Sequence, residues 1–296
     1  MARGNGSITR REKTASIDAD SHNHVSSIRC YRTGSFITSG ALFAVRSPLA
    51  ENPTKDKGIL LDELTWQEAE NVLRPDTVIV IPIGAGSKEH GPHLELKNDW
   101  LLAEYLKREL TKRADVVVAP TVNYHYYPAF VDYPGSITLR LETARDLMVD
   151  ICRSLARYGP RKFYVLNTGL STLRALELSA RILAAEGVHF RYTDMLKLAE
   201  PVEAKLKQEE GGTHADEIET SIMLFIAPST VDMSKAVKDY HPSPQEGLTR
   251  DPAGEGAYSA SGIYGDATLA TREKGEIVLQ TIVDGMLREI QELRNY

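Results

Sequence analysis

Two histidines and three carboxylates, Glu95 among them, gather in one short segment of the chain, between residues 82 and 99. His90 and His93 are two of the eight histidines, and Glu89 and Asp99 lie close to them. A divalent metal prefers this mixture of imidazole and carboxylate ligands. A cation held in this way can lower the pKa of a bound water toward neutrality and polarise a carbonyl oxygen. The segment therefore predicts a metal site that activates water.

The elements on either side of this segment decide where its side chains lie. The apolar run 77–83 predicts a buried strand, and residues 100–110 form an amphipathic stretch that Asn98 or Asp99 could cap as a helix. Open α/β sheets bind their ligands beyond the carboxyl ends of the strands. We therefore expect the segment to lie at that edge of a sheet.

From residue 57 onward, short apolar runs alternate with amphipathic stretches. The predicted strands span 77–83, 116–119, 137–139, 163–166 and 188–192, and the predicted helices span 64–73, 99–110, 143–158, 173–186, 216–227 and 273–293. This alternation predicts crossover connections and a mostly parallel sheet between helical layers. We expect one α/β domain over residues 57–296, with a Gly- and Pro-rich loop at 245–261.

The composition excludes several classes of protein. The chain has 296 residues, is 42% hydrophobic and carries a net charge of −6. This charge argues against a nucleic-acid partner, which needs a concentrated basic face. No apolar run reaches the ~18 to 20 residues that cross a membrane. Cys30 and Cys152 make neither a disulfide framework nor a cysteine metal site, and we expect Cys152 in the core.

The first 56 residues differ from the rest and are expected to form an N-terminal extension. They are polar and lack periodicity at the start, which is typical of disorder. Residues 29–50 have a basic start, a short apolar centre and a small residue near the end, which is the pattern of a weak secretory signal. We expect a cytoplasmic protein, or an exported one if residues 29–50 act as a signal.

Five separate stretches of the chain resemble the creatininase (creatinine amidohydrolase) family. They are the opening Leu-Asp-Glu-Leu-Thr-Trp at 61–66, His-Gly-Pro-His-Leu at 90–94 followed by Asp99, Tyr-Pro-Gly-Ser at 133–136, His-Ala-Asp-Glu-Ile-Glu-Thr-Ser at 214–221, and 262–271 with Lys274 and Gly275. The resemblance implies a three-layer α/β/α sandwich, commonly a homohexamer. It also implies a two-metal site, with zinc or manganese, that hydrolyses amide-type C–N bonds of a small-molecule substrate.

The resemblance also assigns roles to residues. It implies that His90, Asp99, Glu219 and Glu89 are metal ligands, and that His214 and Glu89 are catalytic. A carboxylate such as Asp99 can bridge two cations about 3.5 to 4 Å apart. An imidazole such as that of His214 can deliver a proton to the departing nitrogen, because its pKa lies near neutrality.

Two departures from the family pattern concern the metal ligands. The family has Glu-x-His before Gly-Pro-His, whereas here Lys88 stands two positions before His90 and the glutamate is the adjacent Glu89. Lys88 could pair with a carboxylate of the site and replace the charge of a second cation. The family also has Asn-Gly-His-Gly-Gly-Asn after a strand, whereas Gly169 takes the place of that histidine here.

A third departure concerns the lining of the site. In the aromatic loop at 123–134, Phe130 replaces a histidine of the family pattern and His125 replaces a glycine. Creatinine itself is therefore in doubt as the substrate. The residues that we expect to bind substrate are Ser136, Asn167, Ser171, His125 and Tyr124.

The sequence leaves three functions open. The first is a metal-dependent hydrolase of a C–N bond in a small, possibly cyclic amide. The second is a peptidase or deformylase variant on the same scaffold. The third is a relative without metal that binds a ligand and does not turn it over. In that third case Asp99 would only cap a helix and Glu219 would only face solvent.

Overall fold

Five parallel strands form the centre of the protein. The computed structural model describes residues 56–245 and 247–296, so the expectations for the N-terminal extension lie outside the described residues. The strands are β1 (Ile59–Leu60), β2 (Val78–Ile83), β3 (Val117–Val118), β4 (Lys162–Asn167) and β5 (His189–Tyr192), in the order β1-β3-β2-β4-β5. The connections between them are crossovers, as parallel pairing requires.

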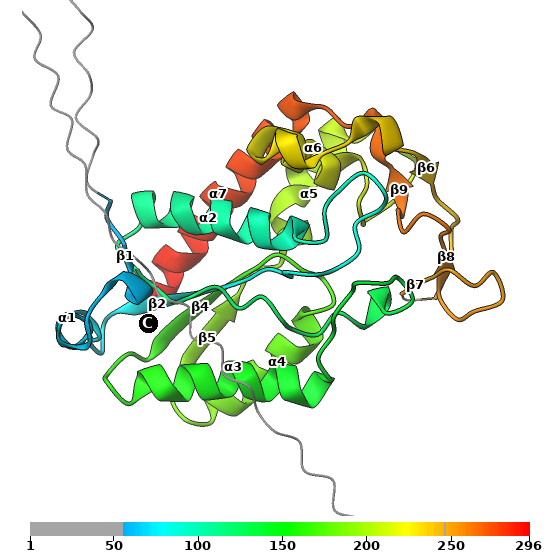
Figure 1. The fold of residues 1–296 in the computed structure, drawn as a ribbon. Coiled ribbons are helices and arrows are strands. Elements are labelled where there is room, and N and C mark those ends of the chain that lie inside the picture. Colours follow the sequence, from blue (N-terminus) through cyan, green and yellow to red (C-terminus); the bar gives the residue numbers. More distant parts are fainter. Residues whose placement is uncertain (1–55, 246) are drawn as a thin grey trace, which may run out of the picture. The chain divides into compact units, whose positions relative to one another are not determined.

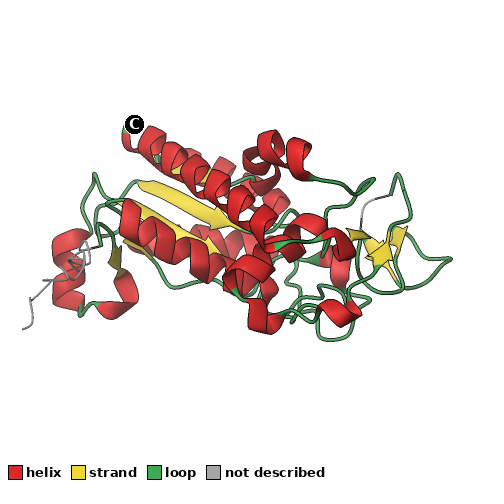
Figure 2. Cartoon of the chain, turned by 90° about the horizontal axis from the view of Figure 1, so that it is seen from above, coloured by secondary structure: helices red, strands yellow, loops and turns green. Residues whose placement is uncertain are grey.

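Helices cover both faces of this sheet (Figures 1 and 2). The helices are α1 (Trp66–Val72), α2 (Asn98–Arg113), α3 (Leu141–Ala156), α4 (Leu173–Ala184), α5 (Met195–Leu206), α6 (Glu217–Ile226) and α7 (Arg272–Arg294). In Figure 1, α2, α5, α6 and α7 lie above the sheet, and α3 and α4 lie below it. The predicted three-layer α/β/α fold is confirmed.

Strand β2 shows why the two layers form. All six of its residues are buried. Val78 and Val80 pack with α2, α6 and α7 on one face, whereas Ile79 and Ile81 pack with α3 and α4 on the other. A strand that is apolar on both faces must be covered on both. The continuous apolar run in the sequence therefore places β2 in the middle of the sandwich.

Four short strands lie outside the main sheet. Strands β6 (Lys238–Asp239) and β9 (Gly265–Asp266) pair antiparallel, and β7 (Leu248–Thr249) and β8 (Ala257–Tyr258) pair parallel. The last two interrupt the predicted loop at 245–261.

Most predicted elements are present, with a few exceptions. Thr65 caps α1 through a capping box with Glu68, and Cys152 is buried in the core as predicted. Residues 137–139 do not form a strand. Helix α5 was not predicted, and it contains Pro201, a residue type that usually kinks or breaks a helix. No helix among the described residues is long and apolar enough to cross a bilayer.

Candidate metal centre

The loop that leaves β2 carries His90 into the centre of the site. The ring is 1% exposed. Its Nδ1 lies 2.9 Å from the carbonyl oxygen of Lys88, which accepts a hydrogen bond from the protonated nitrogen. Its Nε2 lies 2.8 Å from Asp99 Oδ1 and 3.3 Å from Glu219 Oε1. The backbone thus fixes the tautomer that leaves Nε2 able to bind a cation.

Glu219 comes from the first turn of α6. Asp216 caps this helix and accepts hydrogen bonds from the backbone N–H groups of Ile218 and Glu219. The Glu219 carboxylate turns back, so that Oε2 accepts from the N–H of Ala215 at 2.7 Å and Oε1 accepts from Asn98 Nδ2 at 3.1 Å. Two different segments, the residue before α6 and the start of α2, therefore hold this carboxylate.

His214 lies immediately before this helix. Its Nε2 lies 3.1 Å from Glu89 Oε2, and its Nδ1 lies 3.6 Å from Glu219 Oε2. Its ring packs on that of Phe130, with 4.4 Å between the centroids. If Nε2 carries the proton and donates it to Glu89, Nδ1 is unprotonated and its lone pair faces Glu219. A carboxylate behind a histidine is the usual support of a metal-binding imidazole.

Ala215, which joins His214 to α6, has an unusual backbone conformation. Its φ is 48°, and it is the one residue other than glycine with a positive φ among the residues that the structure describes. This region disfavours side chains that carry a Cβ. The conformation turns the chain so that His214 and Glu219 face the same point.

Three side chains fit a single divalent cation. His90, His214 and Glu219 each offer one ligand atom, and these atoms all lie within 4.8 Å of one another. Two imidazoles and one carboxylate are a known ligand set of catalytic zinc, in which further coordination positions stay open for water or substrate. The residues present therefore fit a catalytic metal.

Asp99 and Glu89, which were also predicted as ligands, lie beside this set and have other partners. Asp99 Oδ2 lies 2.8 Å from Lys88 Nζ. Glu89 binds His214 and also accepts from the backbone N–H of Gly91. Their roles as metal ligands stay predictions.

The prediction that Asn98 or Asp99 caps α2 is wrong. The residue at the cap position is Lys97, which makes no side-chain capping bond. The two polar side chains bind Glu219, His90 and Lys88 instead. Residues that resemble a helix cap in the sequence therefore serve the site.

The charges of the site couple metal binding to the protonation of His90. Burial opposes ionisation of Glu219, yet His90, His214 and Lys88 bring its pKa well below the ordinary value. Burial and Lys88 oppose protonation of His90, but Asp99 and Glu219 outweigh them and raise its pKa to about 9. Without metal, His90 is therefore an imidazolium at neutral pH. A metal must displace that proton, so its binding releases protons.

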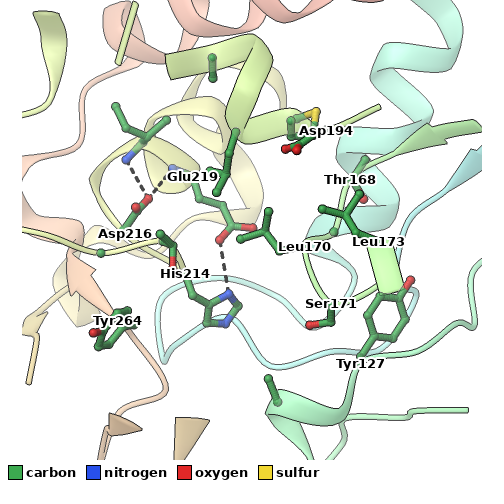
Figure 3. Close-up of a pocket in the computed structure, with 18 of the residues that line it drawn as sticks. Tyr127, Thr168, Leu170, Ser171, Leu173, Asp194, His214, Asp216, Glu219 and Tyr264 are labelled. Carbon is green, nitrogen blue, oxygen red and sulfur yellow. Dashed lines mark hydrogen bonds and ion pairs between the residues drawn. The ribbon is translucent and has the colours of Figure 1, made fainter. Parts of the chain in front are cut away.

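A cleft of 1210 Å³ opens beside these residues. Figure 3 shows His214 and Glu219 on one side of it, and Thr168, Leu170 and Ser171 on the other. This second wall comes from the loop between β4 and α4. It carries hydroxyl and apolar groups, so it can position a substrate but offers no imidazole or carboxylate.

The structure places the predicted substrate-binding residues in different surroundings. Ser171 lines the cleft. Asn167 is buried and donates to the carbonyl oxygens of Gly169 and Thr193. Ser136 accepts a hydrogen bond from the backbone N–H of Glu89.

The last two predicted substrate-binding residues do not line the cleft either. Tyr124 is 46% exposed. His125 is fully buried and neither of its ring nitrogens has a partner. Contacts of Asn167, Ser136, Tyr124 and His125 with a substrate therefore stay predictions.

Other cleft residues were not singled out as site residues from the sequence. Tyr127 and Arg174 line the cleft. Phe130 packs against both His214 and the ammonium of Lys88, whose Nζ lies 4.5 Å from the ring centroid. The replacement of a histidine by Phe130 was a visible signal, whereas Arg174 sits in an ordinary amphipathic helix and gave none.

Comparison with known proteins agrees with the fold and the site. The sequence profile of the creatininase family, described as creatinine amidohydrolase, matches residues 62–290. Creatinine amidohydrolase of Pseudomonas putida is 30% identical over 260 residues, which cover 80% of this chain and 97% of that protein. The mycofactocin precursor peptide peptidase of Mycolicibacterium smegmatis is 27% identical over 221 residues, which cover 72% of this chain and 84% of that protein.

Solved structures give the same result. One described as "Creatininase Mn" and one described as a creatininase mutant of the "Zn-Zn type" each match with a TM-score of 0.68 and 27% identity. Each match covers 79% of this chain and 98% of the other chain.

The fold and the site define a metal-dependent hydrolase with an α/β/α sandwich fold. The chain belongs to the creatininase family. The predictions of the family, of hydrolysis at an amide-type C–N bond of a small molecule and of a divalent metal cofactor are confirmed.

Proposed function

We propose that this protein hydrolyses an amide bond in a small molecule larger than creatinine, with His90, His214 and Glu219 holding one catalytic cation, zinc or manganese. The observation that carries this proposal is the convergence of the three ligand atoms within 4.8 Å at the wall of the cleft. When bound, such a cation supplies a reactive water at neutral pH and polarises the amide carbonyl.

The protein groups around the three ligands prepare them for this task. Glu89 orients His214 through Nε2, and the Lys88 carbonyl orients His90 through Nδ1. Phe130 covers one side of His214 and keeps water from that face. Each ligand thus has a partner that fixes its direction before the cation binds, which is what a metal site requires for affinity and activity.

The resemblance implied that His214 is a proton donor, and the geometry supports a ligand role instead. Its Nε2 is held by Glu89 and its Nδ1 faces Glu219. A His214→Ala variant distinguishes the two roles. Loss of the cation supports a ligand, whereas full occupancy with loss of turnover supports a proton donor.

The size of the cleft supports a substrate with an extended part. Ligand pockets commonly have volumes of about 300 to 1,000 Å³, and this cleft has 1210 Å³. The loop 168–171 and Arg174 line it away from the metal ligands. A peptide-like amide is a second candidate, which the cleft volume and the 27% identity to a peptide peptidase support.

Metal analysis combined with an activity panel tests the proposal. Protein purified without chelator should contain zinc or manganese and should hydrolyse at least one member of a panel of creatinine, cyclic amides, acyclic amides and short peptides. His214→Ala should lose the metal, whereas the matched control His189→Ala, at an exposed position on β5, should keep it. Protein without metal, even after reconstitution with zinc and manganese, would contradict the proposal and support a non-catalytic binding protein.

We also propose that the protein is a homo-oligomer, a hexamer by its resemblance to the family. Large apolar side chains are exposed in the segment around the site, among them Val131 at 57% and Ile137 at 44%. Apolar groups of this kind are typical of surfaces that meet another chain. Light scattering after size-exclusion chromatography gives the mass, and a monomer would contradict this proposal.

A cytoplasmic location is likewise our proposal, with export as the alternative if residues 29–50 are a signal. Cell fractionation with an antibody against residues 56–296 decides between the two.

A further inference from the structure

The ammonium group of Lys88 occupies a place in the site where a second cation would be expected. Lys88 Nζ lies 2.8 Å from Asp99 Oδ2, and both side chains are almost fully buried. The ammonium also lies 4.5 Å from the ring centroid of Phe130, which favours a positive charge over its face. The position of Lys88 is thus set by an ion pair and an aromatic ring together.

We propose that Lys88 is a built-in substitute for a second metal ion, so that each chain binds one divalent cation and not two. This inference rests on the proposed function and sharpens it. One solved relative is described as the "Zn-Zn type", whereas among the residues that the structure describes the converging atoms come from three side chains, His90, His214 and Glu219.

The state of Asp99 supports this inference first. A bridging carboxylate must offer one oxygen to each of two cations. Here Oδ1 is 2.8 Å from His90 Nε2 and Oδ2 is 2.8 Å from Lys88 Nζ. The lysine therefore takes the oxygen that a second cation would need.

The total charge of the site supports it second. The carboxylates of Glu89, Asp99 and Glu219 lie within contact distance of the two site histidines, His90 and His214, and carboxylates are ionised at neutral pH. Lys88 adds one positive charge, and His90 is neutral once a cation has displaced its proton, which leaves an excess of two negative charges. One divalent cation balances that excess. Two divalent cations would leave two uncompensated positive charges in a buried site, which is strongly unfavourable.

The opposite wall supports it third. The loop between β4 and α4 contributes Thr168, Leu170 and Ser171 to the cleft, and Gly169 has no side chain. These groups include no imidazole, carboxylate or thiol. A second cation would therefore receive no strong ligand from this loop.

Counting metal ions tests the inference without an activity assay. Mass spectrometry of the wild-type chain after titration with Zn²⁺ and removal of excess should give one equivalent per chain. Two equivalents would overturn the inference and leave the proposed function intact. Zero equivalents would overturn both, so the two failures are distinguishable.

Variants at Lys88 test the cause. Lys88→Glu removes the ammonium and adds a carboxylate, and we expect the count to rise from one to two equivalents. Lys88→Arg keeps the positive charge and should stay at one. If a Lys88→Glu protein with a wild-type circular dichroism spectrum binds only one equivalent, the proposal that Lys88 takes the place of a second metal ion is overturned. If Lys88→Glu does not fold, Lys88→Met, which only removes the charge, should bind a second Zn²⁺ with measurable affinity by calorimetry; no second binding event would overturn the inference.

Discussion

The two loops that leave the neighbouring strands β2 and β4 end at the same edge of the sheet, yet they carry different chemistry. Loop 84–97 brings Lys88, Glu89 and His90 into the site, and all three are almost fully buried. Loop 168–172 brings hydroxyl, glycine and leucine groups to the opposite wall of the cleft. The loop after β2 therefore supplies His90 to the three-residue set that His214 and Glu219 complete from the start of α6, while the loop after β4 is free to adapt to the substrate. This explains how a family member can lose a ligand from the second loop and still hold a metal.

The largest expected effect follows from removing the central imidazole of the first loop. His90→Ala should abolish metal binding and lower kcat/KM by more than about 100-fold, because even the loss of a residue that supports a ligand costs 10- to 100-fold. Metal content by mass spectrometry and turnover should fall together. Retained metal in this variant would sink the assignment of His90 as a ligand.

Acid should lower the stability of the protein through His125, a buried histidine next to the segment that is hydrogen-bonded to the loop after β2. Backbone hydrogen bonds join Gly84 to Val122 and Gly86 to Asn123, and the neighbouring His125 has a pKa that burial lowers from 6.5 to about 4. The unfolded chain takes up a proton below pH 6.5 that the folded chain accepts only near pH 4. Stability should therefore fall as the pH falls from 6.5 to 4, by about 3 kcal/mol.

Denaturant unfolding at pH 7 and pH 4, with chelator present, measures this effect. His125→Phe fills the same space without a titrating group, and its loss of stability over this range should be smaller. An unchanged pH dependence in His125→Phe would show that His125 is not the cause.

Two matched glycine substitutions test how tightly each loop is packed. A Cβ at Gly84 would collide with the backbone oxygen of Asp99 and lie 2.7 Å from Ala103 Cβ, so Gly84→Ala should destabilise the protein by about 1 to 3 kcal/mol. A Cβ at Gly169 would meet its nearest neighbour, on Thr172, at 3.4 Å. Gly169→Ala should therefore change stability by less than about 0.5 kcal/mol. Thermal unfolding of both variants checks the difference, and equal losses would contradict the comparison.

The smallest effect is expected from a substitution in the loop after β4, which forms the opposite wall of the cleft. Ser171→Ala removes one hydroxyl from the cleft, and a lost hydrogen bond of about 1 kcal/mol corresponds to about a fivefold rise in KM. Neither kcat nor the metal content should change. Steady-state kinetics with the best substrate of the panel separates the two constants, and a fall in kcat without a change in KM would place Ser171 in the chemistry instead.

The sequence predicted the surroundings of loop 84–97 better than those of loop 168–172, for physical reasons. The buried strand, the loop that follows it and helix α6 have strong patterns, and parallel strands bring their carboxyl ends together. These patterns place His90 at the edge of the sheet, whereas its proximity to His214 and Glu219 was implied by the resemblance to the family. The partners of Asn98 could not be predicted, because the same residue types serve as helix caps and as site residues. Nor could the inward position of His125, since a loop has no periodicity that fixes the direction of a side chain.

The left-handed conformation of Ala215 bears on how this enzyme can evolve. Replacing Ala215 by glycine would relieve about 1 to 2 kcal/mol of backbone strain, but it would also give the unfolded chain about 0.4 to 1 kcal/mol of extra freedom. The two effects partly cancel, so selection for thermal stability alone distinguishes alanine from glycine only weakly here. Glycine would, however, allow the backbone before α6 a wider range of conformations, so His214 would be held less firmly. The residue at position 215 therefore affects the orientation of the His214 imidazole more than it affects the stability of the fold.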